Sequence, residues 1–219
     1  MPEQPALVGY TYWFVPARGV TPRQPVLLLL HGTGGDEHDL LPLGEALLPG
    51  AAQLSPRGTV VEDGAYRFFR RLAPGVFDVE DLMLRTHALA DFVDAAADAH
   101  EFVGRPVVAV GYSNGANIAA SLLLLRPSVL AGAVLFRAML PLEPKRVPDL
   151  RGMPVFLAAA RFDEMMPIEA VERLAALLRA GGAALTVHWQ PASHALTAQD
   201  MHEAATWVGR QWREERDQA

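Results

Sequence analysis

Cysteine is missing from this chain of 219 residues, and lysine is almost missing, because Lys145 is the one lysine among 19 basic residues. Without cysteine the chain can form neither a disulfide framework nor a thiolate metal site. Its seven histidines show no H-E-x-x-H or comparable spacing, so we expect no metal and no other cofactor. The formal net charge of -6 would repel nucleic-acid phosphates, and we expect no nucleic-acid partner.

Long apolar runs are missing as well. Uninterrupted apolar runs such as Val26 to Leu30 are far shorter than the roughly 18 residues that suggest a membrane span. The segment from Met1 to Tyr10 has no basic region and no apolar region of the kind found in secretory signals. We therefore expect a soluble cytoplasmic protein without a membrane span, and the sequence leaves open whether it forms a homodimer.

The pentapeptide at residues 111–115 reads G-Y-S-N-G, which fits the pattern G-x-S-x-G. A short β-branched apolar run at 106–110 precedes it, and an Ala/Leu-rich stretch at 114–125 follows it. A strand, a sharp turn and a helix are the context of a nucleophile elbow, in which a strained backbone projects the serine from the sheet. The pattern alone fits an ordinary strand-to-helix loop equally well, and the flanking elements favour the elbow around Ser113.

Along the rest of the chain, apolar strand-like runs alternate with stretches of helical spacing. This alternation predicts one α/β domain over residues 1–219, with a mostly parallel central sheet covered by helices on both faces. Residues 59–76 lack a clean period, so we expect a long loop there, of the kind that serves as a functional flap or is disordered. The expected strands are 8–15, 26–30, 51–55, 106–110, 130–136, 155–160 and 183–189, and the expected helices are 36–48, 79–103, 114–125, 167–180 and 198–212.

A serine nucleophile needs a base that removes its proton, and a histidine base needs a third group that fixes its tautomer. Candidates for both follow later strands, at the carboxyl ends where open α/β sheets bind ligands. Asp163 follows the expected strand 155–160, and we choose it over Glu164, which is a candidate cap for the next helix. His194 follows the last expected strand, and we choose it over His188, which lies within that strand.

Acyl transfer through a serine also requires two N–H donors that stabilise the oxyanion. We assign one to the backbone of Asn114, directly after the serine, and the other to the backbone of Thr33 in the glycine-rich loop 31–35. A phosphate-binding interpretation of that loop lacks both the G-x-x-x-x-G-K-[ST] lysine and the G-x-G-x-x-G spacing. We expect His31 to hold the loop through local hydrogen bonds.

These pieces together resemble the phospholipase/carboxylesterase group of α/β-hydrolases, which also includes acyl-protein thioesterases. The resemblance implies an α/β-hydrolase fold without a large lid domain, and serine-dependent hydrolysis of carboxylic esters or thioesters. It also implies that Ser113, Asp163 and His194 form the catalytic triad. The matching segments span most of the chain: L-H-G-T-G-G-D at 30–36, S-P-R-G at 55–58, G-Y-S-N-G at 111–115, R-F-D at 161–163 with Pro167 after it, and S-H at 193–194.

Two positions depart from the pattern of the group. Ser193 stands where a glycine often precedes the histidine, and the sequence N-G-A at 114–116 replaces the Q-G-G common in the thioesterase branch. The second departure argues against an acylated protein as the substrate. With 219 residues there is little room for an inserted lid, so we expect a small-molecule ester with a short acyl chain rather than emulsified lipid.

Several loop residues have two interpretations each. One set either builds a small apolar acyl pocket or fills the core beneath the loops. A cluster of arginines either attracts an anionic substrate or is simply solvated. The candidate pocket residues are Phe68, Phe69, Met139, Leu140, Met165 and Met166, and the arginines are Arg57, Arg70 and Arg71.

Three other functions stay open from the sequence. A thioesterase or lysophospholipase would use the same scaffold, and a peptidase would share the acyl-transfer chemistry. A non-catalytic relative that binds a ligand or a partner belongs to a different class, and the three filled triad positions count against it.

Overall fold

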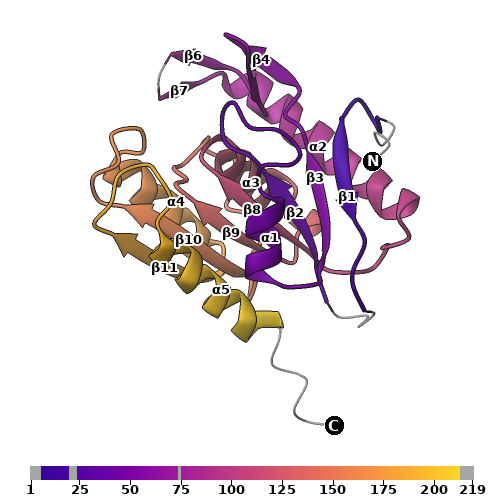
Figure 1. Cartoon of the computed structure of the whole chain (residues 1–219). Coiled ribbons are helices and arrows are strands. Elements are labelled where there is room, and N and C mark those ends of the chain that lie inside the picture. The colour runs from indigo at the N-terminus through magenta and orange to yellow at the C-terminus, as the bar shows by residue number, and fades with distance from the viewer. Residues whose placement is uncertain (1–5, 20–23, 74, 213–219) are drawn as a thin grey trace.

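The computed structural model describes residues 6–19, 24–73 and 75–212 (Figure 1). The expectation of one domain over 1–219 and the interpretation of the N-terminal segment both extend onto residues outside these ranges. Within them, a seven-stranded sheet lies at the centre. Its strands, in spatial order, are β1 (Tyr12–Val15), β3 (Ala52–Pro56), β2 (Val26–Leu30), β8 (Val107–Tyr112), β9 (Gly132–Phe136), β10 (Pro154–Ala160) and β11 (Ala184–Gln190).

The sheet is parallel from β3 to β11, and β1 at one edge runs antiparallel to β3. Helices lie on both of its faces (Figure 1), with α2, α3 and α4 in one core cluster and α1 and α5 in the other. The chain therefore has the expected α/β-hydrolase fold, and no large lid is inserted in the described ranges. The helices are α1 (Leu41–Leu47), α2 (Val79–Ala99), α3 (Asn114–Leu125), α4 (Ile168–Ala180) and α5 (Ala198–Trp212), with a 3-10 turn η1 (Pro127–Val129).

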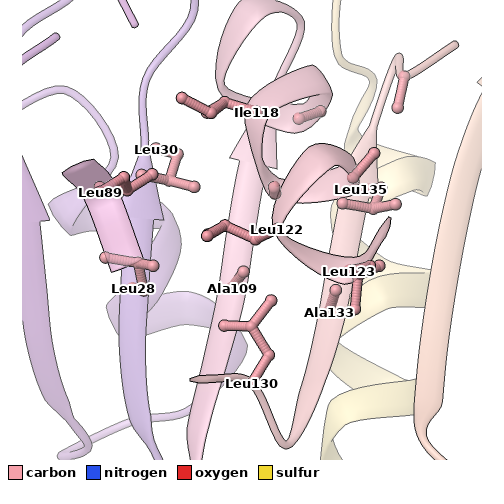
Figure 2. Packing of buried hydrophobic residues seen from close by; sticks show 14 of the residues in the cluster. Leu28, Leu30, Leu89, Ala109, Ile118, Leu122, Leu123, Leu130, Ala133 and Leu135 are labelled. Carbon is pink, nitrogen blue, oxygen red and sulfur yellow. The ribbon is translucent and has the colours of Figure 1, made fainter. Parts of the chain in front are cut away.

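The central strand β2 explains why its sequence is a continuous apolar run. Successive side chains of a strand point to opposite faces. Leu28 and Leu30 pack in the cluster that contains α3, whereas Leu27 and Leu29 pack in the cluster that contains α5. Figure 2 shows the first of these interfaces, where leucines of α3 lie over β2, β8 and β9. All of β2 is buried, so a strand that alternated apolar and polar residues would have placed polar side chains in one of the two core clusters.

Two glycines allow α3 to approach the sheet closely. A Cβ at Gly115 would overlap the carbonyl oxygen of Leu30 on β2, and one at Gly111 would lie 2.5 Å from the carbonyl oxygen of Gly115. Both contacts involve backbone atoms, which cannot swing aside as a side chain can. The expectation that strand and helix are too close here for a Cβ is therefore met, and α3 begins directly at the end of β8.

Two expected elements begin four or five residues later than their patterns predict. The helix expected from Asp36 begins at Leu41, because the Asp36 carboxylate accepts a hydrogen bond from the N–H of His38 (2.8 Å) and holds a turn there. The strand expected at 8–15 begins at Tyr12, since Val8 has a φ of 48° and lies in a tight turn.

Residues 59–76 are not the long loop that the sequence analysis expected. Residues 60–62 pair with 65–67 in one small antiparallel hairpin, and residues 71–73 pair with 76–77 in another. The first turns at Asp63 and Gly64, both with positive φ (52° and 79°). An Asp-Gly pair between short strands is a recognised hairpin signal, but strands of this length are too short to show an apolar period. The hairpin strands are β4 (Val60–Glu62), β5 (Ala65–Arg67), β6 (Arg71–Ala73) and β7 (Val76–Phe77).

Among the described residues, no helix combines the length and the apolar character that crossing a bilayer requires.

We predict that Gly115→Ala lowers the free energy of unfolding by about 3 kcal/mol or more, because the new methyl group overlaps backbone that is fixed in two elements. Gly104→Ala is the matched control, since Gly104 has a φ of 79° and open space around its Cβ position. It should cost only about 1–2 kcal/mol, from the left-handed backbone. Urea denaturation of both variants checks this, and equal losses would contradict the close-approach argument.

Candidate active site

Ser113 occupies the turn between β8 and α3. Its backbone has a φ of 53° and a ψ of -114°, a region that is costly for any residue other than glycine. The N–H of Ser113 donates a hydrogen bond to the carbonyl of Phe136 on β9 (2.9 Å), which ties the turn to the neighbouring strand. The residue is 7% exposed, so the turn is largely enclosed and is not an open loop.

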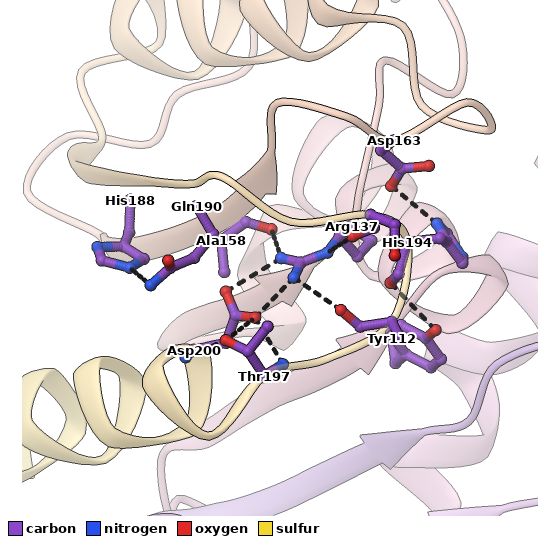
Figure 3. A network of polar contacts seen from close by, with 11 residues as sticks. Tyr112, Arg137, Ala158, Asp163, His188, Gln190, His194, Thr197 and Asp200 are labelled. Atoms are coloured by element: carbon purple, nitrogen blue, oxygen red, sulfur yellow. Dashed lines mark hydrogen bonds and ion pairs between the residues drawn. The ribbon is translucent and has the colours of Figure 1, made fainter.

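Three side chains from distant parts of the sequence meet at this turn. His194 Nε2 lies 2.9 Å from Ser113 Oγ, and His194 Nδ1 lies 2.8 Å from Asp163 Oδ2 (Figure 3 shows the second contact). The other carboxylate oxygen of Asp163 accepts the N–H groups of Met165 and Met166 (2.9 and 3.2 Å). Because both of its oxygens are engaged, the carboxylate is fixed in orientation toward the imidazole. The arrangement gives a hydroxyl an adjacent base and gives that base an orienting carboxylate.

The two alternatives considered for these positions lie elsewhere. Glu164 is exposed to solvent. His188 lies within β11, where its ring stacks on Phe156 at 6.1 Å and its Nε2 contacts the side-chain nitrogen of Gln190 at 2.7 Å. Neither residue is part of the Ser113–His194 arrangement.

The two backbone N–H groups assigned to an oxyanion from the sequence are not used in other hydrogen bonds. No hydrogen bond among the described residues uses the N–H of Thr33 or that of Asn114. Asn114 is the first residue of α3, where an N–H points out of the helix without an intrahelical acceptor. The field of the helix adds partial positive charge at the same end. These are the two donors that the sequence analysis assigned to an oxyanion.

Buried hydrogen bonds fix the loop that carries Thr33. His31 Nδ1 lies 2.6 Å from the carbonyl of Gly32, and His31 Nε2 accepts the N–H of Gly58 (2.9 Å). This pattern requires a neutral imidazole with its proton on Nδ1. Burial lowers the pKa of His31, although the Gly32 carbonyl and the nearby carboxylates oppose that effect. His31 therefore holds the loop locally, as the sequence analysis expected.

The β4–β5 hairpin supports the same loop from the other side. The N–H of Gly34 donates to the carbonyl of Tyr66 (2.9 Å), and Arg67 donates to Thr33 Oγ1 (2.6 Å). The N–H of Phe68 donates to the side-chain oxygen of Asn114 (2.7 Å). One short segment thus contacts both residues whose N–H groups are unpaired.

The arginines expected either to attract an anion or to be solvated are all paired with carboxylates. Their charges are compensated locally, so the structure does not favour an anionic substrate on their account. The pairs are Arg57 with Glu37 (2.5 Å), Arg70 with Asp78 (2.9 Å) and Arg71 with Glu62 (3.2 Å).

The six residues with a pocket or a core interpretation are mostly in the core. Four of them belong to the large core cluster and are at most 6% exposed, a fifth packs against it, and one is exposed. The core-filling alternative therefore describes most of this set, and the exposed methionine lies two residues after Asp163. The four are Phe68, Phe69, Met139 and Met166, the fifth is Leu140, and the exposed residue is Met165.

One group of side chains has the spacing of metal ligands. Asp36, Glu37 and His38 offer ligand atoms within 4.8 Å of one another, in the part of the chain that the structure describes. Glu37 is already held by two hydrogen bonds from Arg57 (2.5 Å each). The group carries no assignment here, since exposed acidic clusters of this kind are common without a metal.

Arg137 is a residue near the site that the sequence patterns did not identify. It directly follows the apolar strand β9, and its side chain is fully buried against Asp200, beside the loop that carries His194 (Figure 3). An arginine at the carboxyl end of an otherwise apolar buried strand was the available signal. Lys and Arg are almost never fully buried unless they are paired, so such a position indicates a specific partner.

Comparison with known proteins places the chain in a family. The model of the dienelactone hydrolase family matches residues 77–216, a range that includes all three of the side chains that meet at the turn. The chain belongs to the dienelactone hydrolase family. A curated relative, MhqD of Bacillus subtilis (strain 168), is named as a hydrolase and is 50% identical over 182 residues, which is 83% of this chain and 91% of that protein.

Solved structures of carboxylesterases resemble the chain over nearly its whole length. The Bacillus cereus carboxylesterase is 45% identical, with a TM-score of 0.88 and coverage of 92% of this chain and 94% of that one. A carboxylesterase from Mesorhizobium loti is 30% identical, with a TM-score of 0.86 and coverage of 95% and 98%. The resemblance to carboxylesterases seen in the sequence is confirmed, and this member of the dienelactone hydrolase family is a hydrolase.

We predict that the free energy of unfolding falls on acidification partly through His31. The pKa of His31 is lowered in the folded state. Below about pH 6.5, His31 is therefore protonated more fully in the unfolded chain than in the folded chain, and the free energy of unfolding decreases as the pH falls. His31→Gln removes this titration. Urea unfolding between pH 7.5 and 5.5 should therefore show the free energy of unfolding falling more steeply for the wild type than for the variant. A steeper fall for the variant, or the same pH dependence in both, would contradict a buried neutral imidazole at His31.

Proposed function

We propose that this member of the dienelactone hydrolase family is a serine carboxylesterase, which hydrolyses small or short-chain carboxylic esters through an acyl-enzyme. One observation carries the proposal. The imidazole of His194 bridges Ser113 Oγ and the carboxylate of Asp163, with contacts of 2.9 and 2.8 Å. The carboxylesterases among the structural neighbours support the same class of reaction.

In the first half of the reaction, His194 Nε2 removes the proton of Ser113 as Ser113 Oγ attacks the ester carbonyl. The imidazole becomes positively charged, and Asp163 stabilises that charge while keeping Nδ1 protonated. In this proposal the N–H groups of Thr33 and Asn114 donate to the oxyanion, because neither is used in another hydrogen bond among the described residues and Asn114 directly follows the nucleophile. The protonated His194 then donates to the leaving alcohol, and the acyl group remains on Ser113.

In the second half, a water molecule takes the place of the alcohol. His194 removes its proton, the resulting hydroxide equivalent attacks the acyl carbonyl, and the same two N–H groups stabilise the second oxyanion. Collapse of this intermediate breaks the bond to Ser113 Oγ, which takes back the proton from His194. The products are a carboxylic acid and the free enzyme, and no cofactor takes part in any of these steps.

The preference for small substrates rests on the surroundings of the site. The residues that could have built a deep acyl pocket, such as Phe68 and Met139, are committed to the core. No large inserted lid exists in the described ranges that would cover a long acyl chain. Phe162 and Met165 flank Asp163 and are exposed, which supplies apolar contact at the rim rather than a tunnel.

We predict that Ser113→Ala lowers kcat for an aryl acetate by on the order of 10⁶, taking a serine protease nucleophile as the guide. The loss reflects removal of the atom that forms the acyl-enzyme. Ser121→Ala is the matched control, because Ser121 is a fully buried serine on α3 that hydrogen-bonds Thr86 (2.8 Å) away from the site. Steady-state kinetics of both variants measure the effect, and activity of Ser113→Ala within tenfold of wild type would overturn the assignment.

A serine-directed fluorophosphonate separates the enzyme from a non-catalytic relative. The wild type and Ser121→Ala should be labelled at Ser113, and Ser113→Ala should not be labelled. A folded wild type that resists labelling would favour a binding protein on this scaffold.

We predict that kcat/KM is highest for short acyl chains in a series of aryl esters from acetyl to palmitoyl, because little depth is left beside the nucleophile. The panel includes a small lactone, given the name of the family, as well as an acyl thioester, a lysophospholipid and an aminoacyl amide. Highest activity on long acyl chains would contradict the size argument. Higher kcat/KM for the thioester, the lysophospholipid or the amide than for every oxyester would favour a thioesterase, a lysophospholipase or a peptidase.

A further inference from the structure

Arg137 lies where the carboxyl end of β9 faces the loop between β11 and α5. The residue is 1% exposed and has a φ of 57°, a left-handed conformation that an arginine rarely adopts. Its backbone N–H donates to the carbonyl of Ala158 on β10 (2.9 Å), which fixes the start of the side chain. From this point the guanidinium reaches toward the segment that carries His194 (Figure 3).

Every N–H of the guanidinium has an acceptor. An arginine side chain carries five N–H donors in a rigid plane. Nε donates to the Ser193 carbonyl (3.3 Å). One terminal nitrogen donates to the Ala158 carbonyl (3.3 Å) and to Asp200 Oδ1 (3.1 Å). The other terminal nitrogen donates to the Ala195 carbonyl (3.0 Å) and to Asp200 Oδ2 (2.6 Å).

Two of these acceptors flank the proposed base. The guanidinium binds the carbonyl before His194 and the carbonyl after it, and the Tyr112 hydroxyl donates to the carbonyl of His194 itself (3.3 Å). Three consecutive carbonyls are therefore held from the sheet side. These hydrogen bonds fix the backbone of His194, and they are separate from the hydrogen bond between its imidazole and Asp163.

Asp200 binds the guanidinium and also caps the first turn of α5. Its carboxylate accepts the N–H of Thr197 (2.8 Å), and its own N–H donates to Thr197 Oγ1 (3.1 Å), which is the reciprocal pattern of a capping box. Burial would raise the pKa of Asp200, but the hydrogen bonds from Arg137 and Thr197 outweigh it and leave the pKa lowered. The carboxylate is thus ionised in the interior and joins the loop of His194 to a helix terminus.

We propose that the buried Arg137–Asp200 pair is a positioning device for the proposed base, with Arg137 setting the place of the His194 imidazole through the carbonyls on either side of it. The inference rests on the proposed function, since it gives His194 the role of base. A fully buried ion pair is often no more stabilising than apolar residues of similar volume, so stability alone is a weak reason for this pair. Its five directed bonds fix a geometry, and a displacement of about 1 Å at a reacting group costs on the order of 10²-fold in rate.

Two variants remove the positioning in different ways. Arg137→Lys keeps the charge but lacks the planar fork that binds both carbonyls and the carboxylate together. The double variant Arg137→Met with Asp200→Asn removes both charges, which avoids an unpaired buried carboxylate, and keeps an amide oxygen for the cap of α5. We expect kcat to fall about 10- to 100-fold in both variants, with KM within about threefold of wild type.

Val208→Ala is the matched control for lost stability. Val208 is fully buried on the same helix, α5, and packs in the core cluster on the face away from α3. The control should lower the melting temperature while kcat stays within about threefold of wild type. A kcat within threefold of wild type in a folded double variant, as judged by circular dichroism, would overturn the proposal.

A spectroscopic readout separates this inference from the proposed function. In proton NMR the hydrogen shared between His194 Nδ1 and Asp163 should give a far-downfield resonance in wild type and Val208→Ala, broadened or lost in Arg137→Lys. An unchanged resonance in Arg137→Lys would refute the positioning role even if Ser113→Ala is inactive. If Ser113→Ala keeps its activity, the proposed function fails, and the resonance still reports whether Arg137 positions the imidazole.

Discussion

The contact on which the site depends is the approach of α3 to β2 at Gly115. The backbone of the helix there lies against the carbonyl groups of Leu30 and His31, with no side chain between them. Because Ser113 precedes the helix and Thr33 follows the strand, this single contact brings the turn of the proposed nucleophile close to the loop 31–35, which carries a proposed oxyanion donor. The large apolar side chains of both core faces hold the two elements in that position.

Buried polar groups add directional hydrogen bonds to the apolar packing. Apolar contacts tolerate small shifts, whereas a hydrogen bond weakens steeply when its angle or length changes. His31 fixes the first loop, Asp163 fixes the imidazole, and Arg137 binds the backbone that carries the imidazole. In this structure the buried polar groups concentrate around the carboxyl edge of the sheet, where directional bonds are needed.

The sequence predicts the sheet and its helices because the signals for them are local and periodic. Buried strands such as β2 and β8 are continuous apolar runs, and Ser113, Asp163 and His194 each follow a strand end. The hairpins β4–β5 and β6–β7 were missed because their strands are two or three residues long, too short for a period to register. The role of Arg137 could not be read either, since its partner lies 63 residues away and nothing local specifies the pairing.

The two hairpins differ in the residues that they contact, and this difference determines how strongly a change in each would disturb the proposed site. The β4–β5 hairpin is bonded to the residues that carry both unpaired donors, through Arg67 and Phe68. The β6–β7 hairpin has Leu72 and Val76 pointing into solvent. The second hairpin is anchored through Arg71, which pairs with Glu62, and through Phe77, whose ring packs against Phe69. Added length beside the exposed Leu72 or Val76 should therefore disturb fewer contacts around the proposed site than added length in the β4–β5 hairpin.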